Sequence, residues 1–119
     1  MNGAIVIRWG QGVPGREAKG MEVFGAAVGR FEALAKQGRI HGHREYFGVT
    51  GGYGGFMIAD GELTELSKIV TEPETMALNN KAASIVEDFD LALYAGGNDQ
   101  TIQELMADYT RDMAEVGLL

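Results

Sequence analysis

Length, composition and charge already exclude several classes of protein. The chain has 119 residues, 45% of them hydrophobic, which is enough for one globular domain and too little for two. It has no cysteine, so disulfides, thiolate metal sites and thiol nucleophiles are excluded. Ten basic residues against seventeen acidic ones give a formal charge of −7, which argues against nucleic acid or an anionic membrane as a partner. Because no signal-peptide or membrane-spanning pattern is present, we expect a cytoplasmic protein.

The first half of the chain predicts a strand, a helix and two further strands joined by a hairpin. Ala4–Trp9 is a β-branched and aromatic run, which is typical of a strand. Over residues 15–37 apolar side chains recur at steps of three and four, which indicates an amphipathic helix, and Gly38 is well placed to end it. Residues 40–49 look extended, and a glycine-rich turn then leads into a strand at 56–59.

The second half predicts three helices and a fourth strand. Asp60 can cap a short helix with one apolar face. Residues 71–74 fit the S/T-x-x-E capping box and predict a second helix that runs to about Val86. A strand follows at 89–95, and Asn98–Asp99 caps a C-terminal helix with an apolar stripe.

This order of elements predicts an α+β fold of the ferredoxin-like, split βαβ kind, with the whole chain, residues 1–119, as one domain. Its four-stranded antiparallel sheet would carry helices on one face, with the C-terminal helix as an addition. The other face would be bare, and a mostly apolar sheet face needs a partner in water. We therefore expect a homodimer that forms through the open sheet face.

Several segments carry a resemblance to a known superfamily. They are Gly38-Arg39-Ile40, Gly55-Phe56-Met57-Ile58, Glu72-Pro73-Glu74 and, near the start, Trp9-Gly10 with Pro14-Gly15-Arg16-Glu17. The chain resembles the dimeric α+β barrel superfamily, its second half resembles YCII-related domains, and its opening resembles a set of small uncharacterised bacterial proteins. The resemblance implies two sheets packed into a barrel whose interior holds a small ligand. Members include cofactor-free monooxygenases, lactone isomerases, haem-handling enzymes and ligand sensors, so the fold does not choose a function.

The sequence departs from the YCII-related pattern at the residues that the resemblance would make functional. Those proteins are thought to use a histidine on the first helix and the aspartate of an Asp-Pro pair. Here the first predicted helix has no histidine, and Glu72-Pro73 stands at the Asp-Pro position. The chemistry that this histidine and aspartate imply in YCII-related proteins is therefore not carried over to this chain.

The segment Gly10–Gly15 matches the G-x-G-x-x-G pattern of dinucleotide-binding loops, after a strand and before a helix. Pro14 removes one backbone donor, and no acidic residue follows at the end of the next strand. The chain is also too short for a doubly wound sheet. We interpret the segment as a glycine-rich turn and expect no cofactor.

His41 and His43 alternate along the second predicted strand together with Glu45, so we expect the three side chains on one face. Two histidines are the candidate catalytic residues, because imidazole transfers protons near neutral pH. The alternative is that this strand lies at the edge of the sheet, where polar side chains simply meet solvent. A metal site is not expected, because no third strong ligand is evident.

Arg8 and Tyr94, with Glu45, are the candidate ligand-binding residues. Alternation puts Ile5, Ile7 and Trp9 on the face of the first strand that packs on the helices and Arg8 on the other face, where it could hold an anionic group. Tyr94 could reach the same interior, because the first and fourth strands are neighbours in this topology. The alternative is that Arg8 pairs with Glu45 or with an acidic residue of a partner subunit.

Helix packing gives three further expectations. Gly20, Gly25 and Gly29 would let the first helix approach the sheet or the second helix closely. Met21 belongs to a stripe of aromatic and methionine side chains that we expect in the core. The C-terminal helix should pack on its own domain or on a partner subunit.

Taken together, the sequence favours a cytoplasmic homodimer that binds a small molecule in the barrel interior. The alternative is a cofactor-free monooxygenase or isomerase of a small aromatic or lactone substrate, with His41 or His43 as the base and Arg8 as the anion holder. Such an enzyme requires the histidines and Arg8 to face one enclosed cavity. A purely structural module would have no cavity of ligand size.

Overall fold

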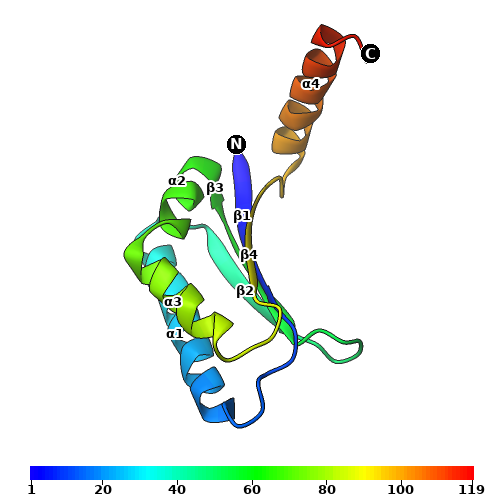
Figure 1. Cartoon of the computed structure of the whole chain (residues 1–119). Helices are drawn as coiled ribbons and strands as arrows, with labels where there is room; N and C mark the ends of the chain where they lie inside the picture. The colour runs from blue at the N-terminus through cyan, green and yellow to red at the C-terminus, as the bar shows by residue number, and fades with distance from the viewer.

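The computed structural model describes all 119 residues. In chain order its elements are β1 (Asn2–Trp9), α1 (Glu17–Lys36), β2 (Gly42–Phe47), β3 (Gly55–Glu62), α2 (Leu63–Val70), α3 (Pro73–Ala83), β4 (Asp90–Ala95) and α4 (Asp99–Glu115). The strands form one antiparallel sheet in the order β2-β3-β1-β4. Helices α1, α2 and α3 lie on one side of this sheet, and α4 extends away from it (Figure 1). The α+β, ferredoxin-like prediction is confirmed.

The ends of two helices follow the residues that predict them. Gly38, just after α1, has a left-handed φ of 73°, which glycine adopts without steric cost. At the other end of the chain, the Asn98 side chain accepts a hydrogen bond from the Thr101 N–H at 2.8 Å and caps α4. Both predictions are confirmed.

The predicted caps around α2 and α3 are wrong. Asp60 belongs to β3, where it pairs with Ala4 on one side and Gly42 on the other, so the strand continues to Glu62. No side chain caps α2 or α3. The Thr71 hydroxyl instead donates to the Lys68 carbonyl at the end of α2. Helix α3 begins at Pro73, whose ring suits a first helical turn, and it ends at Ala83 rather than near residue 86.

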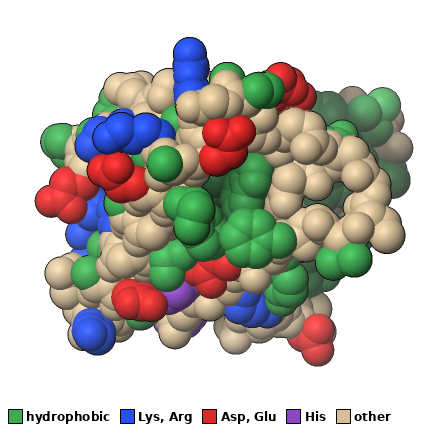
Figure 2. Space-filling model, turned by 90° about the horizontal axis from the view of Figure 1, so that it is seen from below, with side chains coloured by type: hydrophobic (Ala, Val, Ile, Leu, Met, Phe, Trp, Pro, Cys, Tyr) green, Lys and Arg blue, Asp and Glu red, His purple; other side chains and the backbone are tan.

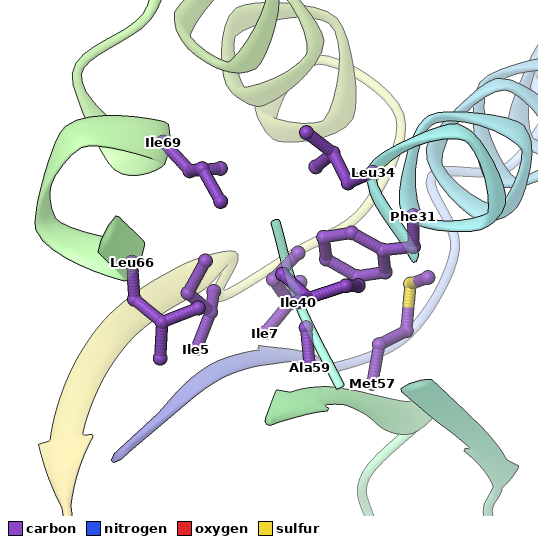
Figure 3. Close-up of a cluster of buried hydrophobic side chains, with 9 residues drawn as sticks. All are labelled: Ile5, Ile7, Phe31, Leu34, Ile40, Met57, Ala59, Leu66 and Ile69. Carbon is purple, nitrogen blue, oxygen red and sulfur yellow. The ribbon is translucent and has the colours of Figure 1, made fainter. Parts of the chain in front are cut away.

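The core lies between the sheet and α1–α3, where nine hydrophobic side chains meet (Figure 3). Burial is nearly complete for Ile5, Leu66 and Ile69, each at most 1% exposed. The nine are Ile5, Ile7, Phe31, Leu34, Ile40, Met57, Ala59, Leu66 and Ile69. The prediction that Ile5 and Ile7 pack on the helices is thereby confirmed. Each side chain of this size contributes about 1.5–3 kcal/mol when it leaves water.

The glycines and the methionine of α1 do not play the predicted packing roles. A side chain at Gly25 or Gly29 would meet nothing within 4 Å, and one at Gly20 would meet only Ile85, at 3.6 Å. Met21 is 78% exposed, so it is not a core residue. The helical period is correct, but Gly25 and Gly29 lie on the outer face of α1.

Two arginines and one glutamate tie the helical layer together. Arg39, just before β2, donates to Glu72 at 2.7 Å and to Glu65 of α2 at 2.7 Å. Arg30 of α1 donates to the other oxygen of Glu72 at 2.9 Å. Hydrogen bonds from the two arginines hold the pKa of Glu72 below its usual range, and the larger contribution comes from Arg39. Glu72 therefore joins the segment between α2 and α3 to α1 and to the start of β2.

Helix α4 stands apart from the rest of the chain. It leaves the end of β4 and projects beyond the sheet, with no other element packed along it (Figure 1). Its first turn is fixed, because Thr101 Oγ1 accepts a hydrogen bond from the backbone N–H of Asn2 at 2.9 Å. Ile102, Met106 and Tyr109 are 48–59% exposed, so the predicted stripe is uncovered in the single chain. None of the helices combines the length and the apolar composition needed to span a membrane.

Candidate functional site: an apolar cavity between sheet and helices

A cavity of about 750 Å³ lies between the sheet and helices α1 and α3. Figure 2 shows the molecule from the side on which hydrophobic side chains line a hollow. The apolar lining includes Ile7, Trp9, Phe24, Met57, Phe89 and Leu91. A volume of this order is typical of sites for small organic molecules.

Three aromatic rings from different elements form one wall. Trp9 ends β1, Phe24 lies in the middle of α1, and Phe47 ends β2. The Phe24 and Phe47 ring centroids are 5.0 Å apart, and each ring is 6.2 Å from that of Trp9. These are distances at which aromatic rings attract one another. Phe47 is 63% exposed and so stands toward solvent, whereas Trp9 and Phe24 are half-buried.

The glycine-rich loop after β1 forms one end of the cavity. Three of its amides are already used, since Gly10 N–H donates to the Glu87 carbonyl at 2.8 Å, Val13 N–H to the Ile85 carbonyl at 2.9 Å and Gly15 N–H to Glu17 Oε1 at 3.1 Å. A bridge between Gly12 and Val86 completes the attachment. A phosphate-binding loop needs free amides that point at the ligand, so these contacts favour the interpretation of this loop as a turn.

Most polar side chains of the lining already have partners within the chain. Those with partners are Gln11, Arg16, Glu17, Arg30 and Thr75. The half-buried Asn79 of α3 and the Trp9 indole N–H form no hydrogen bond within the chain. The lining is thus mainly apolar, and these two polar groups within it have no partner in the chain.

His43 and Glu45 form a pair on the same side of the sheet as the cavity. They are opposite Ala59 and Met57 of β3, both of which face the helices. His43 Nδ1 is 2.5 Å from Glu45 Oε1, and the two side chains are 17% and 19% exposed. The imidazole also lies against the core, with its centroid 6.0 Å from that of Phe31. Of the predicted site residues, these are the two that the fold brings together.

His41 does not join them. It lies just before β2, its side chain is exposed, and its backbone N–H donates to the Asp60 carbonyl at 2.7 Å. Strand alternation applies only from Gly42 onward, so His41 is not placed by it. No group of three or more histidine, aspartate or glutamate side chains is arranged to hold a metal ion.

Arg8 and Tyr94 lie on the opposite, open face of the sheet. Tyr94 pairs with Ala4 of β1, and Arg8 pairs with Asp90 of β4. Arg8 Nη2 donates to Asp90 Oδ2 at 3.1 Å, and this bond raises the pKa of Arg8. The predicted ligand set of Arg8, Glu45 and Tyr94 is therefore divided between two faces. Arg8 is tied to a carboxylate, as in the structural alternative, but the carboxylate belongs to its own chain.

Sequence reasoning missed the contribution of the end of β2 and of the segment around β4. The sequence pattern gives no functional role to Phe47, which lies in the extended segment 40–49, or to Phe89, with which the predicted fourth strand begins. Nothing in the sequence marks Asn79 as a lining residue. Helix α3 is only weakly amphipathic, and a single asparagine in such a helix is an ordinary surface residue. The alternation of side chains along β2 could have identified Phe47 as a lining residue, since Phe47 shares its face of the strand with His43 and Glu45.

The fold and the cavity define the class: an α+β protein of ferredoxin-like topology with an apolar site between sheet and helices. No family model matches the sequence, and no curated protein matches it. Solved structures do match. A dimeric ferredoxin-like protein of unknown function from Jannaschia is 9% identical with a TM-score of 0.64, over 81% of this chain and 100% of that one.

Two further structures are similar. One is a dimeric protein of unknown function with a ferredoxin-like fold from Bacteroides fragilis, 13% identical, TM-score 0.57, over 78% of this chain and 94% of that one. The other is SnoaB, a cofactor-independent oxygenase from Streptomyces nogalater. It is 15% identical with a TM-score of 0.57, over 82% of this chain and 94% of that one. These identities show the fold alone. The closer likeness to YCII-related domains stays a prediction.

Proposed function

We propose that this protein is a cytoplasmic homodimer that binds a small, largely apolar molecule in the cavity between its sheet and helices. The observation that carries the proposal is the cavity of about 750 Å³ with its aromatic wall. The cavity opens to the molecular surface, so a ligand could enter it without unfolding the core (Figure 2). A largely apolar hollow of this size between sheet and helices is typical of sites that bind small organic molecules.

The lining indicates the kind of molecule. Trp9, Phe24 and Phe47 favour a planar or aromatic body, because aromatic side chains bind such rings edge to face or in offset stacks. The carboxamide of Asn79 can bind one polar group, such as a carbonyl or hydroxyl. The ligand class that fits is a small aromatic or lactone compound with one or two oxygen substituents.

Two uncovered apolar surfaces support self-association. The first is the open face of the sheet, where Tyr46, Phe56 and Tyr94 are 39–48% exposed and the first two rings stack at 4.8 Å. The second is the stripe of α4. The Jannaschia and Bacteroides proteins of the same fold are described as dimeric. We expect two copies to meet through the open sheet faces, with each α4 on the other copy.

A cofactor-free oxygenase or isomerase is the second candidate. SnoaB, which shares the fold, is described as a cofactor-independent oxygenase. Within this chain the half-buried pair of His43 and Glu45 on the cavity side supports it. Arg8 does not support it, because Arg8 lies on the other face of the sheet.

The cavity can be tested with the protein's own fluorescence. Trp9 is the one tryptophan of the chain and lies in the cavity wall. The neutral aromatic lactone 7-methoxycoumarin absorbs where tryptophan emits, so binding should quench Trp9 in a saturable way. Ala27 lines the cavity, and Ala27→Phe should weaken binding at least about tenfold, which is about 1.4 kcal/mol.

Ala26→Phe is the matched control. Ala26 is the neighbouring residue of α1, is exposed, and does not line the cavity, so this variant should bind as the wild type does. Circular dichroism shows whether both variants fold. If they bind equally, or if Trp9 is not quenched, the cavity is not the binding site.

A further inference from the structure

The pair of His43 and Glu45 has the geometry of a proton-accepting group. An ionised glutamate can only accept hydrogen bonds, so in the contact of 2.5 Å the donor is Nδ1–H of His43. In a neutral imidazole with its proton on Nδ1, the lone pair is on Nε2, which has no hydrogen-bond partner within the chain. Glu45 both fixes the ring and stabilises the imidazolium that forms when Nε2 gains a proton.

Glu45 is the charged side chain that pairs with His43, and neither residue forms another ion pair. On β3 the residues opposite are Ala59 and Met57, which carry no charge. On α1, Phe31 lies against the imidazole, and the adjacent Arg30 is held by Glu72, Glu74 and Thr75. Within the chain, an imidazolium at His43 would therefore have Glu45 as its ion-pair partner.

The pair adjoins the cavity at the β2 edge. Phe31, which contacts the His43 ring, lines the cavity, and so do Met57, opposite Glu45, and Phe47, two residues further along β2. Figure 2 shows acidic and histidine surface beside the hydrophobic hollow. The pair is not itself part of the lining, so it is the outer edge of a ligand seated on the aromatic wall that would come near His43.

We propose that the His43–Glu45 pair accepts a proton from a weakly acidic hydroxyl of the bound ligand, which makes phenols and enols the preferred ligands of the cavity. The inference rests on the proposed function. In the step, the ligand O–H bond breaks, the proton forms a bond to Nε2, and the electron pair stays on the ligand oxygen. The products are a phenolate or enolate and an imidazolium held by Glu45, so charge and atoms balance.

The test compares two coumarins of nearly equal shape. The hydroxyl of 7-hydroxycoumarin ionises near neutral pH, and its neutral and anionic forms absorb at different wavelengths. An apolar cavity alone disfavours the charged form and would lower the ratio of anion to neutral form below that of the free compound. Proton transfer to His43 predicts the opposite sign. We expect the ratio in the wild-type complex to exceed the free value about tenfold, which is a shift of one pKa unit.

Three variants distinguish the effect of the His43–Glu45 pair on ligand ionisation from the effect of the apolar cavity. In His43→Gln the ratio should fall below the free value, and in Glu45→Gln it should fall toward it. His41→Gln is the matched control and should behave as the wild type, because His41 is exposed and unpaired with Glu45. His41→Gln should also bind 7-methoxycoumarin, which has no proton to lose, with the affinity of the wild type.

Each outcome decides something. If 7-methoxycoumarin binds but His43→Gln leaves the ionisation of 7-hydroxycoumarin unchanged, the proton-accepting role is overturned and the cavity stands. A bound wild-type ratio below the free value overturns it as well. If neither coumarin quenches Trp9, the proposed function fails and the inference falls with it.

Discussion

Glu72 is the residue on which the helical layer depends most for its polar contacts. Its two oxygens accept hydrogen bonds from Arg39 at 2.7 Å and from Arg30 at 2.9 Å. Each arginine has a further carboxylate, Glu65 or Glu74, so the three helices α1, α2 and α3 meet in one network. A network that joins several elements stabilises more than isolated surface pairs do.

The lowered pKa of Glu72 predicts how stability changes with pH. A group whose pKa is lower in the folded chain stabilises it above the unfolded pKa, and this contribution is lost as pH falls through the folded value. Glu72→Gln should therefore lower the melting temperature by a few degrees at neutral pH. The difference from the wild type should shrink below the ordinary pKa of glutamate.

Glu22→Gln is the control for this prediction. Glu22 pairs with Lys19 on the exposed side of α1, and both side chains are at least 70% exposed. This substitution should change the melting temperature little at any pH. Equal effects of the two variants across the pH range would contradict the role given to Glu72.

At the scale of elements, α4 is the part of the fold that a single chain leaves unexplained. Helix α4 has 17 residues, and most of the stability of such a helix in a protein comes from packing of its apolar face. Its direction is nevertheless fixed by the Asn98 cap and by the bond from Asn2 to Thr101. A fixed direction and an uncovered apolar stripe together favour a second copy of the chain as its partner.

Charging the stripe should weaken the dimer. Met106 and Tyr109 lie on the apolar side of α4, and the double substitution Met106→Lys, Tyr109→Lys should raise the dissociation constant of the dimer roughly tenfold or more. The double control Gln103→Lys, Ala107→Lys adds the same charge on another face of the helix. Light scattering after size exclusion should give twice 12.8 kDa for the wild type and the control. Equal masses for the two double variants would contradict the role of α4.

For the whole molecule, the sequence predicts the sheet and its two faces well, because strand alternation and helical period are local. Ile5 and Ile7 against Arg8 illustrate this, since one strand shows both faces in its own pattern. The strand order also follows from the topology of the split βαβ fold.

The candidate site was harder to predict, because it depends on which residues of different strands share a face. Glu45 was grouped with Arg8 and Tyr94, although the registers of β2 with β3 and of β1 with β4 place them on opposite faces. Register is a long-range property that no single segment reveals. The cavity depends in the same way on how far α1 and α3 stand from the sheet.

The two faces of the sheet differ in what they carry. The open face and α4 carry the uncovered apolar surface through which we propose that two copies associate, and the helix-covered face carries the cavity and the His43–Glu45 pair. A ligand site within each subunit would then persist whether or not the dimer forms. Binding and association can accordingly be measured separately.

The most direct test of the central claim is to locate the bound ligand by isotope-filtered NMR. With labelled protein and unlabelled 7-methoxycoumarin, we predict nuclear Overhauser effects from the ligand to the methyl groups of Ile7, Ile85 and Leu91, which line the cavity. Effects to the open-face residues Tyr46, Phe56 or Tyr94 alone, or no effects at ligand saturation, would contradict the claim.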